Sequence, residues 1–100
     1  MPYQIKALKI FRKQIQKLDS KAKHTIHEKI ELVKQNPFRY KRLHSKKYSK
    51  VFRIRFSINK KETRLIYAVI EPNIILVCLL DRKKDYKDLE KYLIKIKETK

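Results

Sequence analysis

The first part of the chain changes from a two-residue repeat of apolar positions to a helical one. Polar residues separate the first apolar side chains, which are Tyr3, Ile5 and Ala7. The following apolar residues recur three or four positions apart: Leu8, Phe11, Ile15 and Leu18. Alternation is typical of a half-buried strand, and the wider spacing is typical of an amphipathic helix. We therefore predict a strand over residues 3–7 that runs into a helix over residues 8–18.

A second helix follows at once. Asp19 and Ser20 carry the side-chain oxygens that cap helix N-termini. Downstream, one apolar stripe is formed by Ala22, Ile26, Ile30 and Val33. Asn36 and Pro37 end the helix, because proline disfavours helical backbone in the residue before it. The two helices are expected to form a hairpin.

A basic segment and a two-faced strand come next. Residues 38–50 show no apolar period, so we predict a loop there. In residues 51–58, apolar side chains at the even positions alternate with others that include Arg53 and Arg55. This pattern gives the strand one apolar face and one basic face.

Two more strands are predicted, over residues 64–70 and 74–80. Short turns at residues 59–62 and 71–73 introduce them, so consecutive strands pair antiparallel. Because residues 74–80 are apolar on both faces, this strand belongs in the centre of the sheet.

The C-terminal residues predict a third helix. Its apolar face is formed by Tyr86, Leu89, Leu93 and Ile96. Asp85 and Asp88 lie in its first turn, where the helix dipole favours acids. The predicted fold is α+β in the order β-α-α-β-β-β-α, with an N-terminal strand and helical hairpin packed on a small, twisted, mainly antiparallel sheet. A chain of 100 residues buries one modest core, so residues 1–100 are expected to form a single domain.

The net charge of the chain restricts the classes of molecule that it can bind. The chain has 28 lysines and arginines against 10 acidic residues, a net charge of +18. Such a field attracts polyanions, and nucleic acid, an anionic membrane and an acidic protein all qualify. The longest apolar run, from Ile74 to Leu80, is too short to span a bilayer. The N-terminus lacks the features of a secretory signal, so we expect a cytoplasmic protein without a membrane partner.

Arginines mark the candidate site. Residues 39–64 contain 11 lysines and arginines and a single acid. Arg53 and Arg55 project from one strand face about 7 Å apart, roughly the spacing of successive phosphates. Arg64 opens the next strand and Arg82 follows the last one. A twisted antiparallel sheet is expected to bring these arginines around one phosphate-binding surface.

Each member of this cluster also has a structural interpretation. Exposed strand faces favour charge, so Arg53 and Arg55 taken alone need no function. Arg64 shares its face with apolar residues, where an arginine needs a buried partner or a functional reason. Tyr86 fits core packing as well as it fits base stacking or catalysis.

The sequence lacks the residue patterns of metal sites and of nucleotide-binding loops. His24, His27 and His44 show no paired metal-ligand spacing, and the ten acids form no carboxylate cluster. The absence of glycine excludes Gly-rich phosphate loops. We therefore expect no metal and no cofactor. Cys78 lies in an apolar run and is expected to be a buried, inert side chain.

If the bound polyanion is RNA, the protein could cleave it without a metal. In that reaction a 2′-hydroxyl of the RNA attacks its own phosphate. Arginines orient the backbone and stabilise the extra negative charge. Because arginine keeps its proton, the general base would be Tyr86, His44, Lys83 or Lys84, and the sequence leaves these four open.

The order of these motifs resembles the RelE/ParE toxin superfamily. Members have a helical hairpin, then Asn-Pro, here Asn36-Pro37, and a lysine-rich stretch that ends in leucine, here Leu43. The segment Tyr48 to Arg55 is similar to the basic strand of the family, and Arg64 to Tyr67 is similar to its R-h-h-Y strand. Arg82 to Tyr86 looks like its closing arginine-to-tyrosine segment.

The resemblance implies a RelE-like toxin that cleaves messenger RNA in the ribosomal A site and so inhibits translation. Its catalytic residues would be Arg53, Arg55, Arg64, Arg82 and Tyr86. Further RNA-binding residues are expected in the basic loop and after the last strand: Lys41, Arg42, His44, Lys46, Lys47, Lys50, Lys83 and Lys84. The expected partners are the ribosome, messenger RNA and an acidic RelB-like antitoxin, which would form a heterocomplex with the toxin.

A second interpretation stays open. A ParE-like inhibitor of DNA gyrase, or a non-catalytic protein that binds nucleic acid or an antitoxin, would have the same fold. Arginines stand at positions 53 and 55 where lysines are common, and Asp81 stands where many members have glycine or histidine. These departures leave the general base open. Arg64 and Arg82 with a nearby aromatic ring favour cleavage over gyrase inhibition.

Overall fold

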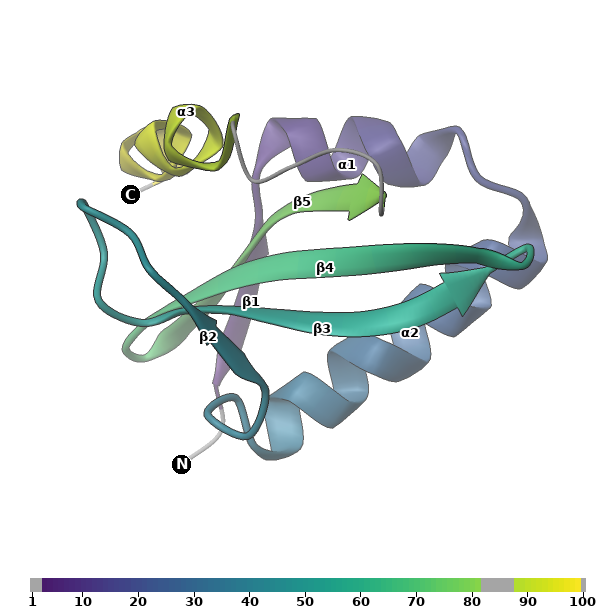
Figure 1. The fold of residues 1–100 in the computed structure, drawn as a ribbon, viewed down its shortest axis with the longest axis horizontal. Coiled ribbons are helices and arrows are strands. Elements are labelled where there is room, and N and C mark those ends of the chain that lie inside the picture. Colours follow the sequence, from purple (N-terminus) through teal and green to yellow (C-terminus); the bar gives the residue numbers. More distant parts are fainter. Residues whose placement is uncertain (1–2, 82–87, 100) are drawn as a thin grey trace.

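The computed structural model describes residues 3–81 and 88–99 (Figure 1). Five strands form one sheet in the order β1-β5-β4-β3-β2. Their bounds are Gln4–Ala7 for β1, Lys41–Leu43 for β2, Val51–Ile58 for β3, Lys61–Ile70 for β4 and Asn73–Asp81 for β5. β1 pairs parallel with β5, and the other neighbours pair antiparallel. The predicted α+β class and mainly antiparallel sheet are confirmed.

Helices cover both faces of this sheet. They are Lys9–Gln16 (α1), Ser20–Gln35 (α2) and Leu89–Ile94 (α3), which continues as the 3-10 helix Lys95–Thr99 (η2). The α2 helix runs behind the sheet in Figure 1 and shares a buried core with β3, β4 and β5. The α3 helix and η2 share a second core with the opposite face. Each face of the sheet therefore has its own apolar layer.

The strand β2 is an addition to the predicted order. Lys41–Leu43 pairs antiparallel with β3 at the edge of the sheet, inside the predicted loop over residues 38–50. That loop prediction is therefore wrong for these three residues. Two of the three are charged and exposed, so no apolar alternation marked the strand. The chain turns back along β3, and pairing with its edge is what orders this segment.

The helical hairpin agrees with the sequence. The Asp19 carboxylate caps α2 by accepting a hydrogen bond from the Ala22 backbone N–H at 2.8 Å. Ala22, Ile26 and Val33 are buried along one stripe, and the helix ends at its C-cap, Asn36. The first helix is shorter than predicted, because α1 covers only Lys9–Gln16.

A tight turn sets the register of β3 and β4. Ile58 pairs with Lys61, so only Asn59 and Lys60 form the loop. Both have positive φ, 50° and 67°. A type I′ hairpin turn requires positive φ at both of its central residues. This turn is favoured in two-residue hairpins because its twist matches that of the strands. The left-handed backbone at Lys60 costs about 1 kcal/mol, a cost that the long strand pairing offsets.

The side chain of Gln14 attaches α1 to β5. The β1–β5 pairing ends at Leu76, so no strand among the described residues flanks the following part of β5 on that side. The Gln14 amide takes that place: its Oε1 accepts from the Leu79 N–H at 2.7 Å, and its Nε2 donates to the Leu79 carbonyl at 2.9 Å. Two backbone groups that need partners are thus satisfied by one side chain.

Tyr67 anchors the segment that follows α2. Its hydroxyl donates to the Pro37 carbonyl at 2.6 Å, and its ring stacks on Phe52 with centroids 5.6 Å apart. The residue is fully buried. Burial, and secondarily the nearby Tyr40, raise the pKa of Tyr67 well above its usual range. The hydroxyl therefore remains a protonated donor that fixes the chain just before β2.

Candidate nucleic-acid interface

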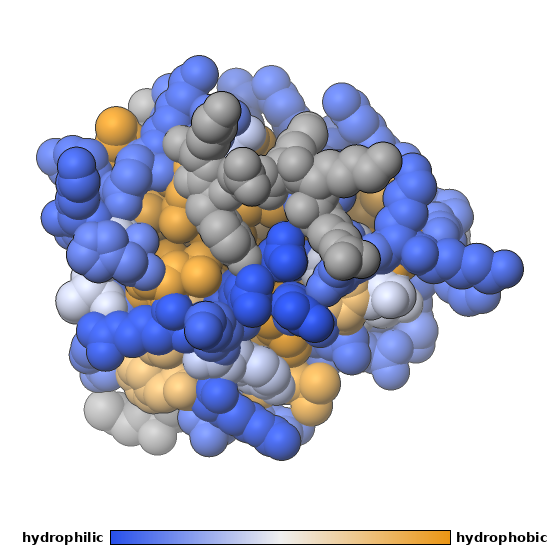
Figure 2. Space-filling view, viewed as in Figure 1, coloured by the Kyte–Doolittle hydropathy of each residue, from blue (hydrophilic) through white to orange (hydrophobic). Residues whose placement is uncertain are grey.

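Four cations line up on one face of β2, β3 and β4. The register places Arg55 directly opposite Arg64, and Lys41 directly opposite Arg53. Side chains of directly opposite residues leave the same face of a sheet with Cβ atoms about 5 Å apart. We call these four residues, Lys41, Arg53, Arg55 and Arg64, the arginine face. Figure 2 shows hydrophilic side chains across the middle of this surface, over β3 and β4.

The α3 helix explains how Arg64 coexists with apolar neighbours. Ile66 and Ala68 follow Arg64 on the same face and are fully buried in the core that includes Leu89 and Leu93 of α3. Arg64 itself is only half-buried. The face is therefore divided into an apolar part, which packs with α3, and a basic part beside it. Arg64 marks the border, which the apolar pattern alone did not reveal.

Glu62 holds one member of the arginine face in place. Its Oε1 lies 3.1 Å from Arg55 Nε, and the Glu62 side chain is 26 % exposed. Like charges directly opposite each other repel, and Arg55 and Arg64 stand in that relation. The carboxylate offsets part of this repulsion. Sequence reasoning counted Glu62 only as the single acid of a basic segment.

The loop between β2 and β3 carries further cations. His44, Lys46 and Lys47 are all exposed in this loop. The Lys46 backbone N–H donates to Glu90 Oε1 of α3 at 3.0 Å. The Ser45 hydroxyl oxygen accepts from the backbone N–H groups of Lys47 and Tyr48. The loop is thus tied to α3, and its predicted RNA-binding residues His44, Lys46 and Lys47 stay accessible.

Two predicted RNA-binding residues lie away from the arginine face. Arg42 pairs with Phe52, whose side chain belongs to the core on the α2 side, and its Nε donates to the Ser49 carbonyl at 2.8 Å. Lys50 Nζ lies 5.6 Å from the ring centroid of Phe38 and 3.9 Å from Glu71 Oε1. Strand alternation separates Arg42 from Arg53, and Lys50 lies just before β3.

The remaining predicted site residues lie outside the described residues. These are Arg82, Lys83, Lys84 and Tyr86. The last residue of β5, Asp81, pairs with Thr63, and Leu80 before it pairs with Arg64. The described part of β5 therefore ends next to the strand that carries Arg64.

Residues 3–81 and 88–99 offer little support for other chemistries. Within them, no three His, Cys, Asp or Glu side chains gather as metal ligands would. Nor does any helix there have the length and apolarity needed to cross a membrane. Cys78 is fully buried, and burial raises the pKa of its thiol to about 12. This thiol resists ionisation and is a poor nucleophile.

The arrangement suits an extended phosphodiester backbone. Guanidinium groups hold phosphate oxygens in a bidentate manner and stay charged at any working pH. Residues two apart on a strand are separated by about 7 Å, so Arg53 and Arg55 can contact successive phosphates. Arg55 and Arg64, opposite each other, can contact the same phosphate from two strands.

Several solved structures have a similar fold. The structure is similar to an arginine double mutant of the Escherichia coli toxin RelE in the free state, with a TM-score of 0.68, 19 % identity and 98 % of each chain covered. It is also similar to chains of two toxin–antitoxin complexes. For intact E. coli RelBE, the TM-score is 0.64 at 17 % identity, with 82 % of this chain and 99 % of that chain covered.

The second complex is RelBE2 from Mycobacterium tuberculosis, with a TM-score of 0.66 at 19 % identity, and 82 % of this chain and 100 % of that chain covered. No protein-family model matches the sequence, and no curated protein matches it either. The likeness therefore lies in the arrangement of the elements and extends over most of the chain. The chain has the fold of the RelE toxins.

Proposed function

We propose that the protein is the toxin of a toxin–antitoxin pair and a metal-independent endoribonuclease that cleaves messenger RNA in the ribosomal A site. The arginine face is the observation that carries this proposal. Its four cations stand on three adjacent strands, and Arg55 and Arg64 oppose each other directly. A general basic surface would not require such a register.

In this proposal, the 2′-hydroxyl attacks the adjacent phosphorus and displaces the 5′-oxygen of the next nucleotide. Arg53 and Lys41 would orient the backbone, which lowers the entropic part of the barrier. Arg55 and Arg64 would stabilise the negative charge that develops on the phosphorane oxygens. The 2′-hydroxyl proton goes to a general base, and His44, Lys83, Lys84 and Tyr86 remain the candidates for that role.

The partner proposed for the toxin is an acidic antitoxin. Two of the similar structures are complexes of a RelE-type toxin with its antitoxin. A chain with a net charge of +18 gains electrostatic complementarity from an acidic partner, which also accelerates encounter. We propose a heterocomplex in the cytoplasm, in which the antitoxin prevents cleavage.

Ribosomes programmed with a defined messenger RNA test this function. The protein is added, and primer extension maps new 5′ ends. Cuts in the A-site codon are expected with the wild type and with Lys23→Ala, a change on an exposed position of α2. Arg64→Lys keeps the charge but loses the bidentate fork, so its cleavage rate should fall by at least tenfold. Arg82→Ala should abolish the cuts.

Each outcome of this assay has a definite meaning. Uncut message with folded wild-type protein would refute the nuclease proposal. If the protein then inhibited DNA supercoiling by purified gyrase, gyrase inhibition would replace RNA cleavage as the proposed function. If Arg64→Lys and Lys23→Ala cut as fast as the wild type, the arginine face would have no part in the reaction. Thermal melts of each variant separate loss of function from loss of fold.

A further inference from the structure

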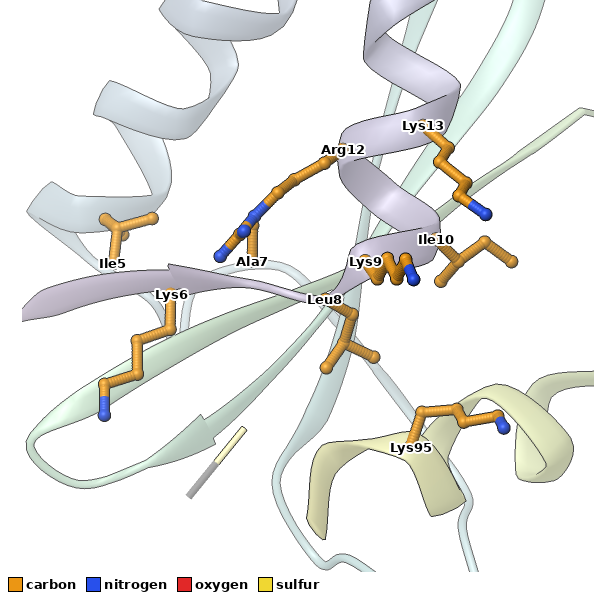
Figure 3. A pocket seen from close by; sticks show the side chains of 9 residues that line it. All are labelled: Ile5, Lys6, Ala7, Leu8, Lys9, Ile10, Arg12, Lys13 and Lys95. Carbon is orange, nitrogen blue, oxygen red and sulfur yellow. The ribbon is translucent and has the colours of Figure 1, made fainter. Parts of the chain in front are cut away.

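A second basic surface lies where β1 passes into α1, beside η2 (Figure 3). It is an open cleft of about 1080 Å³. Its cations, all exposed, are Lys6, Lys9, Arg12, Lys13 and Lys95. Its apolar lining consists of Ile5, Ala7, Leu8 and Ile10. We call it the β1–α1 cleft. It lies at the β1 edge of the sheet, whereas the arginine face spans β2, β3 and β4.

The described lining of this cleft is strongly basic. Among the described residues that line it, five are cationic and none is acidic. Like charges around one concavity repel each other, and concave walls of low dielectric constant focus their field. An anionic ligand would relieve this repulsion.

The lining favours a protein over RNA. None of the described lining residues has an aromatic ring, a side-chain amide or a hydroxyl, and Arg12 is the one described lining residue whose side chain can stack on a nucleobase. Instead, apolar side chains accompany the cations. Leu8 points from the β1–α1 junction toward the segment that carries Lys95 in Figure 3. Lysine stems add further apolar surface beneath their charged ends.

We propose that the β1–α1 cleft binds an acidic, amphipathic segment of a partner protein. Carboxylates of the segment would pair with the cations at the rim, and its apolar side chains would lie on the half-buried Ile10 and on the lysine stems. Only the identification of this partner with the antitoxin rests on the proposed function. The cleft and the arginine face would then bind two different polyanions on one small molecule.

Charge reversal at matched positions tests the cleft. The probe is a fluorescein-labelled synthetic helix of glutamate and leucine, and its affinity is measured by anisotropy at physiological salt. Lys6→Glu/Lys9→Glu should weaken binding by at least about tenfold, because both charges are within reach of the peptide. The control, Lys21→Glu/Lys23→Glu on exposed positions of α2, changes the net charge equally. It should change binding less than about twofold, since charges beyond about 8 Å are screened.

A second probe separates apolar recognition from charge. Replacing the leucines of the peptide by serine keeps every carboxylate and should weaken binding about tenfold or more, because the apolar burial is lost. A short single-stranded RNA should show the opposite dependence. It should bind Arg64→Ala more weakly than the wild type. Its affinity for Lys6→Glu/Lys9→Glu should equal its affinity for the control pair. Should the reversed pair melt early, Lys6→Gln/Lys9→Gln replaces it.

The amide chemical shifts of the wild-type protein locate the peptide directly. Shifts that concentrate on residues 5–13 and 95 support the proposal. Equal weakening by both reversed pairs, an unchanged affinity of the serine peptide, or shifts confined to the arginine face would overturn it. The ribosome assay is independent of these measurements, so loss of the cleavage proposal and loss of the cleft proposal are distinguishable.

Discussion

Glu62→Gln separates two roles for the carboxylate beside the arginine face. If Glu62 only lowers the positive charge, the substitution adds one net charge and RNA should bind more tightly. If Glu62 fixes Arg55 at 3.1 Å, as the structure indicates, the substitution frees the guanidinium and RNA should bind more weakly. The two roles therefore predict opposite signs.

The magnitude follows from the geometry. Arg55 is 55 % exposed in this pair and Glu62 is 26 % exposed, so the ion pair contributes at most about 1 kcal/mol to folding and the variant stays folded. Ordering one long side chain costs about 0.5–1.5 kcal/mol on binding, a cost that the existing ion pair has already met. Its loss corresponds to about a 2- to 12-fold weaker complex. A neutralising role would instead steepen the salt dependence by about one counterion.

The assay is fluorescence anisotropy with a short RNA whose 2′-hydroxyls are methylated, so that cleavage cannot occur. Glu31→Gln is the control: it removes the same charge and an exposed ion pair with Lys34 (3.3 Å) on α2. Its affinity for RNA should equal or slightly exceed that of the wild type. Tighter binding by Glu62→Gln than by Glu31→Gln would refute the positioning role.

Three further predictions concern register, attachment and pH. Lys41→Ala should weaken RNA binding more than Arg42→Ala, because only Lys41 shares the arginine face; the reverse order in the same anisotropy assay would contradict the register. Gln14→Ala should lower the free energy of unfolding in urea by about 1–3 kcal/mol, because both Leu79 backbone groups lose their partner; an unchanged midpoint relative to Gln16→Ala would count against this. Above pH 9, the Cys78 thiol ionises in the unfolded chain but stays protonated in the fold, where its pKa is raised to about 12. The stability of the wild type relative to Cys78→Ala should therefore fall by about 1.4 kcal/mol between roughly pH 8 and 10, whereas a pH-independent difference would show an unperturbed thiol.

Apolar periodicity predicted the elements that bury a full face. The stripe of α2, the two-sided apolar β5 and the alternating β3 follow directly from burial on one face or two. Arg53 and Arg55 were placed on one face for the same reason. Periodicity carries no signal for a strand as short and charged as Lys41–Leu43. The different faces of Lys41 and Arg42 were therefore not predictable.

Cross-strand geometry was harder to predict than strand content. The turn was expected over residues 59–62, whereas the structure confines the loop to Asn59 and Lys60. This difference extends β4 back to Lys61 and places Glu62 within reach of Arg55. Only the pairing register shows that Arg64 opposes Arg55. Contacts of this kind depend on the turn type. The type I′ turn usually has glycine at a position with positive φ, and here Lys60 takes that position, so the sequence does not indicate the turn.

The Gln14 side chain has a further consequence for the behaviour of the protein at high concentration. The strand Asn73–Asp81 is the most apolar segment of the chain, and its backbone edge beyond Leu76 would be a template for strands of other molecules. Because Gln14 occupies the Leu79 amide and carbonyl, these two groups cannot pair with a strand of another molecule. A single polar side chain on a neighbouring helix thus blocks strand addition at this point of the sheet edge.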